Sequence, residues 1–445
     1  MKRVLSIWVA ALVAMVAGSA VKVQAQDVTS YFIDGSPMRM EHNAAFAPKQ
    51  GYLAFPLVGS LSVATNGNMA LGSFLVPVDG SLLTIFDTNV SADVALAGLS
   101  TGVNSLGFES RIGILNTGWY RKNRKGFISL DVNLKSSASI SLPYELFEFV
   151  KTAPDYASIP ELGANVDLYS EIALGYSFPI TKRLYVGVRA KGLVGLASVS
   201  ASVNQMDIKM AADEWSGDVS GSLTTDQLGY GGAVDIGVDY SLFNNRLKLS
   251  AGLNDLGFIK WSAKNNTTES FTNSFSFTGA DMDVDGSLDL ESAIDFDDFE
   301  MVAQESCGSV RMLQSSFSAG AEFLMWKERV SIGAVYVGSY GNRALSDHRV
   351  AGVVTFKPSK WFSIASSYSA TFYDGNFSDS AVGIAAYLYT PVLSIYGSAD
   401  ILLAKKTPAY YIPINQAATN FSFGLAVPIG RKGIRGVEEW REGAE

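Results

Sequence analysis

Residues Ser105 to Ser141, SLGFESRIGILNTGWYRKNRKGFISLDVNLKSSASIS, form two alternating arms around a charged turn. In the first arm, Glu109, Arg111 and neighbouring small residues alternate with apolar residues. In the second arm, Asp131 and Lys135 alternate with apolar residues in the same way. Because successive side chains of a strand point to opposite faces, this hairpin has one apolar face and one polar, charged face.

Two classes of protein use such a hairpin. A soluble sandwich buries the apolar face, whereas a membrane barrel turns that face to lipid and lines a wet lumen with the charged one. The rest of the chain favours the barrel, because about fourteen predicted strands are joined by connections that are alternately short and long. The longer connections are 66–103, 142–165, 201–227, 261–313, 342–347, 374–378 and 404–417.

This sorting of loops indicates an outer-membrane barrel, which has short periplasmic turns and long external loops. We therefore predict an all-β chain, a transmembrane up-and-down antiparallel β-barrel of about 14 strands over residues 52–430. The segment 261–313 is expected to be an acidic external loop. A secreted β-sandwich or adhesin remains the alternative fold.

The N-terminus carries an export signature. Lys2 and Arg3 precede an apolar run that ends near Ala20, and small residues lead to a cleavage site after Ala25. This pattern predicts a cleaved signal peptide over residues 1–25, with a membrane anchor helix as the alternative. We expect a plug-like N-terminal segment over 26–51 and a tail over 431–445, both in the periplasm of a Gram-negative bacterium.

Composition excludes several functions. Lys and Arg number 34 against 43 Asp and Glu, for a net charge of −9, which argues against nucleic-acid binding. Cys307 is the single cysteine, so no internal disulfide is expected. We expect no cofactor and no catalytic residue, because the two histidines, His42 and His348, lack a nucleophile in a convincing arrangement.

Alternation assigns charged residues to the lumen and aromatic residues to the membrane interfaces. The lumen-facing candidates are Glu109, Arg111, Asp131, Lys135, Glu171, Arg189, Lys191, Asp235 and Asp239. The residues expected in the interfacial aromatic belts are Trp119, Tyr120, Phe127, Tyr176, Phe178, Tyr240, Trp261, Trp326, Trp361, Tyr373, Tyr387 and Tyr389. A short helix is predicted over 143–151, either gating the barrel mouth or capping the surface.

The acidic insertion contains a weak calcium motif. Alternating carboxylates before a glycine turn suit calcium, and the candidate ligands are Asp281, Asp283, Asp285 and Asp289. A helix-flanked calcium loop would end on a glutamate where this chain has Ser292. We therefore expect a solvated external loop and no specific metal site.

Four stretches carry a resemblance to a known family: 169–176 (YSEIALGY), 184–193 (LYVGVRAKGL), 232–240 (GAVDIGVDY) and 249–261 (LSAGLNDLGFIKW). They resemble a Bacteroidota family of outer-membrane barrels of unknown function, which is similar to FadL-type and PorP/SprF-type barrels. The resemblance implies fourteen strands and an N-terminal plug, with His42 and Asn43 as plug residues. Such plugs often carry an Asn-Pro-Ala turn, and here Asn43-Ala44-Ala45 lacks the proline.

These observations predict passive uptake of a hydrophobic or amphipathic small molecule through a plugged barrel in outer-membrane lipid. The alternative is a barrel that transports nothing and anchors or completes a secretion, motility or envelope assembly with a protein partner. A discontinuous strand wall or an apolar cavity would favour transport, and a solidly filled lumen with large ordered loops would favour the scaffold. A membrane hydrolase is a third, weaker hypothesis.

Overall fold

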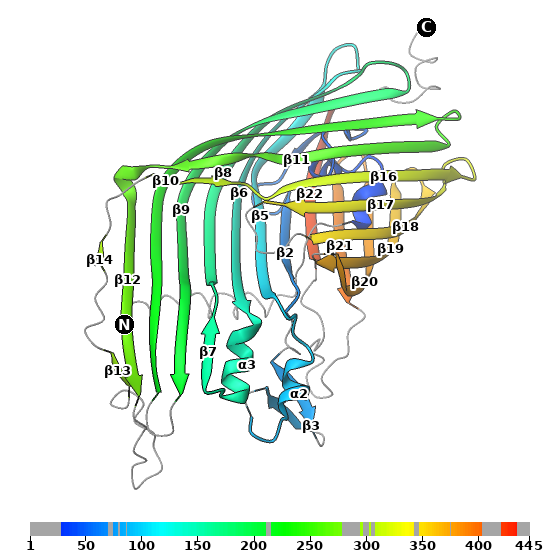
Figure 1. Cartoon of the computed structure of the whole chain (residues 1–445). Coiled ribbons are helices and arrows are strands. Elements are labelled where there is room, and N and C mark those ends of the chain that lie inside the picture. The colour runs from blue at the N-terminus through cyan, green and yellow to red at the C-terminus, as the bar shows by residue number, and fades with distance from the viewer. Residues whose placement is uncertain are drawn as a thin grey trace.

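The computed structural model forms a closed antiparallel barrel of fourteen strands (Figure 1), which confirms the predicted fold. It describes residues 28–433 except 70–73, 79–80, 86, 211–214, 278–293, 297–301, 304–307, 342–346, 374 and 403–419. β1 (Gln50–Ala54) and β2 (Leu61–Gly67) together make the first strand of the wall. The others are β5 (Val103–Tyr120), β6 (Phe127–Pro143), β8 (Leu162–Pro179), β9 (Leu184–Met210), β10 (Trp215–Leu242), β11 (Leu247–Trp261), β16 (Ser315–Met325), β17 (Val330–Tyr340), β18 (Asp347–Ser359), β19 (Phe362–Tyr373), β20 (Asn376–Tyr389), β21 (Ser394–Leu402) and β22 (Asn420–Lys432).

The sheet closes through its first strand. Leu53 of β1 pairs with Val427 of β22 on one side and with Thr117 of β5 on the other. Leu61 of β2 likewise pairs with Phe423 and Ile112. Closure gives the backbone N–H and C=O groups of both edge strands hydrogen-bond partners. A barrel in lipid requires this because no water is available to pair with them.

Exposed and buried side chains alternate along the strands, which distinguishes an outer apolar face from a face toward the lumen. On β18, Val350 and Val354 are 49% and 50% exposed, whereas Ala351 and Val353 are 1% exposed. The exposed side chains point outward and suit contact with lipid tails. The alternation predicted from the sequence therefore separates lipid-facing from lumen-facing positions along this wall.

Part of the wall continues well past the barrel. β9 and β10 have 27 and 28 residues, whereas β16 and β17 have 11 each. The first part of β10, residues 215–226, pairs with β12 (Asn266–Phe277) past the ends of the shorter strands. The sheet therefore extends at the lower left of Figure 1. We call residues 198–226 of β9 and β10 together with β12 the extended sheet.

The prediction of a polar loop over 201–227 is therefore wrong. Residues 201–210 and 215–227 are paired across β9 and β10, with one register shift at Ser220, and the hydroxyls of Ser202 and Ser222 lie 3.0 Å apart. A strand with water on both faces needs no apolar side, so the alternation that reveals membrane strands is absent here. The predicted acidic loop 261–313 is also partly structured, with η4 (Ala263–Asn265), β12, β13 (Ile294–Phe296), β14 (Val302–Ala303) and β15 (Val310–Met312).

A small subdomain lies at the same end of the barrel. The hairpin β3 (Leu75–Val78) and β4 (Ser81–Thr84), helix α2 (Ala92–Leu96) and helix α3 (Tyr144–Thr152) share an apolar cluster in which Phe147 is buried. The short strand β7 (Tyr156–Ile159) follows α3 and pairs with β9. Helix α3 agrees with the predicted helix 143–151 to one residue, and it packs in this cluster (Figure 1).

Among the described residues, no helix is both long and apolar enough to span a bilayer.

The predicted aromatic belts are correct only in part. Trp326 and Trp361 are 76% and 57% exposed on the outside, as interfacial residues should be. In contrast, Trp261 is 1% exposed because its position on β11 faces inward. The belt prediction is likewise wrong for the other buried aromatic residues, Tyr120, Phe127, Tyr373 and Tyr387.

Candidate functional site in the barrel lumen

Residues 28–49, which we call the N-terminal segment, lie inside the barrel. The segment forms two short 3-10 helices, η1 (Thr29–Phe32) and η2 (Pro37–Glu41), and most of its residues are buried. Because 3-10 turns and loops leave backbone groups unpaired, the segment needs partners from the surrounding wall.

The wall supplies these partners from several sides. Thr29 Oγ1 donates to Asp400 Oδ1 at 2.7 Å on β21, and the Tyr31 hydroxyl lies 3.0 Å from the Ser250 hydroxyl on β11. Asn43 Nδ2 donates to the carbonyls of Val238 and Ala251 at 3.1 and 2.9 Å. Further hydrogen bonds reach the backbone carbonyls of the segment from Ser177, Asn254, Ser318, Arg189 and Tyr120. The segment is thus held across the lumen by strands on opposite sides.

Glycines in the wall leave room for this contact. A methyl group added to Gly237 on β10 would overlap Asn43 Oδ1, and one added to Gly187 on β9 would overlap the Ala44 carbonyl. Asn43 Oδ1 in turn accepts from the Ala45 N–H at 2.8 Å, which fixes the turn that lacks a proline. Asn43 therefore docks the segment, and His42 contributes a 2.9 Å contact between its Nε2 and Ser30 Oγ.

The lumen has one apolar half. Val28, Tyr31, Phe32, Ile33, Met38 and Phe46 of the segment pack against inward-facing residues of β17–β21, namely Val335, Val337, Ala351, Val353, Ala365, Ala385, Tyr387 and Tyr396. This contact buries apolar groups that a membrane barrel would otherwise expose to a wet lumen. It anchors one side of the segment.

The other half is a buried ion network, built on inward positions of β5–β11. Arg189 Nη2 lies 2.9 Å from Asp131 Oδ2, and Lys191 Nζ lies 2.7 Å from Asp235 Oδ2. Glu171 is fully buried, and its Oε2 forms an ion pair with Lys135 Nζ at 2.7 Å. Buried charges of this kind persist only when they are paired, so the network constrains the geometry of the wall.

Asp255 joins the network through a β-bulge in β11. Its carboxylate lies 2.7 Å from Lys191 Nζ and 3.2 Å from Lys135 Nζ, and its N–H donates to Asp235 Oδ1 at 2.7 Å. The register slips between Val234 and Ile236, and Asp255 has φ +56°. The bulge turns inward a side chain that strict alternation would point at lipid.

Glu41 connects the N-terminal segment to this network. Its Oε1 lies 2.6 Å from Arg111 Nη1 and 3.5 Å from Arg189 Nη2. Burial pushes the pKa of Glu41 upward, but the guanidinium groups of Arg111 and Arg189 outweigh that effect and lower the pKa to about 2. Glu41 is therefore a carboxylate at neutral pH.

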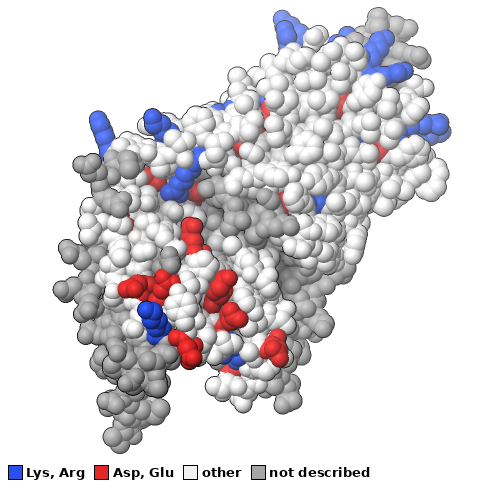
Figure 2. Space-filling view, viewed as in Figure 1, with Lys and Arg blue, Asp and Glu red and all other residues white. Residues whose placement is uncertain are grey.

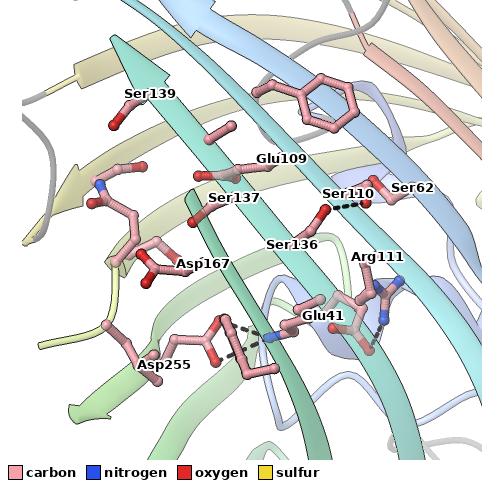
Figure 3. Close-up of a pocket in the computed structure, with 18 of the residues that line it drawn as sticks. Glu41, Ser62, Glu109, Ser110, Arg111, Ser136, Ser137, Ser139, Asp167 and Asp255 are labelled. Carbon is pink, nitrogen blue, oxygen red and sulfur yellow. Dashed lines mark hydrogen bonds and ion pairs between the residues drawn. The ribbon is translucent and has the colours of Figure 1, made fainter. Parts of the chain in front are cut away.

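A cavity of about 230 Å³, some of whose lining residues are drawn in Figure 3, lies on the side of the segment toward the extended sheet, which we call the long-loop side. Arg111 and Lys135 line it from the wall, and Glu41 and His42 from the segment. Arg311 of β15 also lines it and reaches across to Asp167 on β8 and Asp226 on β10, at 3.2 and 3.1 Å.

The strand pairing of the barrel wall is interrupted between β1 and β2, next to a second, smaller hollow, and we call this place the interrupted wall. Six residues separate Ala54 from Leu61, whereas only two separate their partners on β22, Ala426 and Phe423. Surplus residues therefore leave the sheet, with Leu57 at φ +68° and 60% exposed on the outside. Behind them is a hollow of about 20 Å³ lined by Tyr52, Gly59 and Ser60, among others, which has room for about one water.

The two hollows are neighbours. Met38 and Glu41 of the N-terminal segment and Tyr396 of β21 line both of them. A route from the cavity to the interrupted wall therefore passes these three side chains.

Of the lumen-facing candidates, the structure brings Arg111, Asp131, Lys135, Glu171, Arg189, Lys191 and Asp235 together in the ion network. Glu109 lines the cavity. Asp239 is partly exposed on β10, where it faces Lys248 rather than the network. The four calcium candidates lie outside the described residues.

Sequence reasoning missed Glu41, Asp255 and Arg311. Arg311 and Asp255 carry a usable signal, because each is a charge in or beside an apolar strand that would otherwise meet lipid. Glu41 has no such signal, since nothing in the sequence of residues 26–51 indicates which side chain meets the wall.

Comparisons with known proteins bear on the family. The model of the family described as "Family of unknown function (DUF5723)" matches residues 44–230 and 221–400. The chain belongs to this family. The DUF5723 match covers the wall residues of the ion network, and Glu41 lies just before it. No curated protein matches the chain.

Three solved structures illustrate the similarity in the course of the chain. The Pseudomonas putida toluene transporter TodX is 9% identical, with a TM-score of 0.40, over 91% of this chain and 97% of that chain. A Pseudomonas aeruginosa FadL homologue is also 9% identical, with a TM-score of 0.44, over 92% and 99%. The translocator domain of the Neisseria meningitidis autotransporter NalP is 7% identical, with a TM-score of 0.32, over 87% and 91%. Values this low carry no conclusion about what the chain does.

Proposed function

We propose that this protein is an outer-membrane barrel for passive uptake of an amphipathic small molecule. The molecule binds in the cavity on the long-loop side, the N-terminal segment moves, and the molecule leaves through the interrupted wall or the lumen. In this proposal a signal peptide over 1–25 is removed and both termini are periplasmic. A relation to PorP/SprF-type barrels and a source among the Bacteroidota remain predictions.

The observation that carries the proposal is the interruption of the wall between Ala54 and Leu61 beside a hollow that shares its lining with the cavity. A barrel that only anchored other proteins would have no need for surplus residues at a lumen hollow. The segment that separates the hollows is attached by apolar packing on one side, and on the other by polar contacts and the ion pairs of Glu41 with Arg111 and Arg189, rather than by strand pairing. Such polar contacts exchange for water more readily than a β-ladder does.

The mixed lining favours an amphipathic molecule over a hydrocarbon. The cavity is polar, with Arg111, Lys135 and carboxylates, whereas the interruption presents exposed Phe55 and Leu57 to the outside. Moving a pure hydrocarbon through the cavity would strip water from charged groups without replacing it.

The test is uptake into liposomes that carry the purified barrel. Deleting Pro56–Val58 makes the strand nearly continuous, and we expect uptake of a fluorescent alkyl probe to fall at least about tenfold, since the exit is removed. Replacing the same three residues by alanine keeps the length and should leave uptake near the wild-type rate. Both variants should retain the gel-mobility difference between boiled and unboiled samples that marks a folded barrel. Equal uptake by the deletion and alanine variants would overturn the exit route.

A second candidate is the non-transporting scaffold, favoured by the extended sheet. Figure 2 shows acidic side chains gathered over the half of the molecule that contains this sheet and α3, on the face in view. Large ordered surfaces outside the membrane suit a protein partner. If cross-linking in whole cells captures one polypeptide on this sheet and the liposomes show no uptake, the scaffold function replaces the uptake proposal.

A further inference from the structure

The cavity on the long-loop side is lined by hydroxyl groups. Six serines on inward positions of five strands line it, namely Ser62, Ser137, Ser139, Ser316, Ser339 and Ser422. Figure 3 shows Ser137 and Ser139 beside the carboxylates of Glu109 and Asp167. An apolar ligand would bury these groups without hydrogen bonds, so the lining selects against a hydrocarbon at this point.

The charges of the lining select against an anion. Among the described residues, the cations that line the cavity are Arg111, Lys135 and Arg311. Each of those cations already pairs with a carboxylate, at 2.6 Å for Arg111, 2.7 Å for Lys135 and 3.1 Å for Arg311. A carboxylate or phosphate headgroup would therefore have to displace a carboxylate that is already paired with the cation.

Two side chains of the lining have polar atoms without partners. Among the described residues, Gln314 Oε1 and Nε2 and Trp261 Nε1 are buried and make no hydrogen bond. Both side chains line the cavity, and Trp261 is 1% exposed. Gln314 Nε2 and Trp261 Nε1 are hydrogen-bond donors, and Gln314 Oε1 is an acceptor. A ligand that satisfies all three atoms must be able both to accept and to donate hydrogen bonds. A hydroxyl does both, whereas a quaternary ammonium does neither.

We propose that this cavity binds the uncharged, hydroxyl-rich headgroup of an amphipathic molecule, as in a sugar or polyol joined to an apolar tail. Gln314 and the serines bond the hydroxyls, while the tail extends past Met38 and Tyr396 toward the interrupted wall. The cavity volume of about 230 Å³ lies below the usual range for drug-sized ligands, so it fits a small headgroup. This inference rests on the proposed function for the tail's route, but the headgroup site is tested by binding alone.

The experiment compares headgroups on one tail. The full-length barrel in phosphatidylcholine nanodiscs is titrated, below micelle-forming concentrations, with octyl glucoside, octyl sulfate and octyltrimethylammonium, and binding is followed by calorimetry. Methyl glucoside, which lacks the tail, shows whether the headgroup suffices by itself. We expect octyl glucoside to bind at least about tenfold more tightly than either charged compound.

Variants assign the binding to this cavity. Gln314→Leu should weaken octyl glucoside binding about tenfold, because the hydroxyls lose both amide partners. The matched control is Gln227→Leu, which changes an exposed glutamine on the outer face of β10 and should leave affinity unchanged. Uptake of the alkyl probe by the liposomes is measured in parallel.

Several results would overturn the headgroup proposal. They are tighter binding of the sulfate or the ammonium compound, the absence of any binding, and an affinity that Gln314→Leu does not change. If uptake continues in those cases, the transport function stands and only the headgroup class is wrong. If wild-type liposomes show no uptake while octyl glucoside binds as expected, the headgroup site stands and the transport function is wrong.

Discussion

Glu41 makes the ion pairs that join the N-terminal segment to Arg111 and Arg189 in the charged half of the lumen. Its pKa of about 2 lies below that of an exposed glutamate, about 4.3. A carboxyl whose folded pKa is depressed adds stability at pH values above its unfolded pKa, and that stability is lost as pH falls through the folded pKa. We expect the attachment of the segment to weaken between about pH 4.3 and pH 2.

The measurement for Glu41 is hydrogen exchange of the N-terminal segment at pH 7, 4 and 2.5. Wild type should lose protection over this range, whereas Glu41→Gln should begin with lower protection and change less. A matched control is Glu148→Gln on the exposed side of α3, which should behave as wild type. Identical profiles for wild type and Glu41→Gln would contradict the role of the ion pair.

Gly237 tests how closely the segment approaches the wall. Gly237→Ala adds a methyl group into Asn43 Oδ1, so the turn at Asn43 must move away from β10. We expect a severalfold increase in the leak conductance of single barrels in planar bilayers. Gly352→Ala is the control, since nothing lies within 4 Å of its added carbon. Equal conductance for both variants would show that the turn does not close the lumen.

At the scale of single elements, β15 depends on one arginine. Arg311 reaches from this three-residue strand to Asp167 and to Asp226, whose side chain is fully buried. Arg311→Met leaves Asp226 without its cation, and removing one partner of a buried pair costs about 3–5 kcal/mol. We expect the amides of 310–312 to lose about a hundredfold in exchange protection, while Lys209→Met, on exposed β9, should change nothing there. Retained protection in Arg311→Met would mean that pairing with β11 alone holds β15.

The same scale shows what the sequence could predict. Strands that cross the membrane were found because lipid on one side and water on the other impose alternation, as in the hairpin 105–141. The extended sheet was missed because its strands have water on both faces. Asp255 was missed because a bulge breaks the period of two, and its charge at an apparently lipid-facing position is the signal that could have revealed it.

The interrupted strand marks another limit. Residues 52–65 read as one strand, although Pro56 and Gly59 lie within it. Proline cannot donate to a ladder, and the surplus residues form where Pro56 stands. Pro56 and Gly59 thus indicate a break in the strand. The sequence does not show that this break lies beside a hollow in the lumen, because the N-terminal segment that lines the hollow reaches it only in the folded chain.

At the scale of the whole molecule, the lumen is divided between an apolar half and a charged half, with the N-terminal segment fixed to both. In the proposed function this segment closes the path along the barrel axis, and Met38, Glu41 and Tyr396 line both the cavity and the hollow at the interrupted wall. Passage of a ligand therefore requires the segment to move, which is the central claim of this account.

A reversible cross-link tests that claim most directly. Thr29 Oγ1 and Ser367 Oγ lie 2.6 Å apart, so Thr29→Cys with Ser367→Cys, in a Cys307→Ser background, brings two thiols within reach of a disulfide. Uptake of the alkyl probe is measured in liposomes before and after reduction. We predict that the oxidised barrel takes up little probe and that reduction restores the rate of the Cys307→Ser protein. Equal uptake in the oxidised and reduced states would contradict the account.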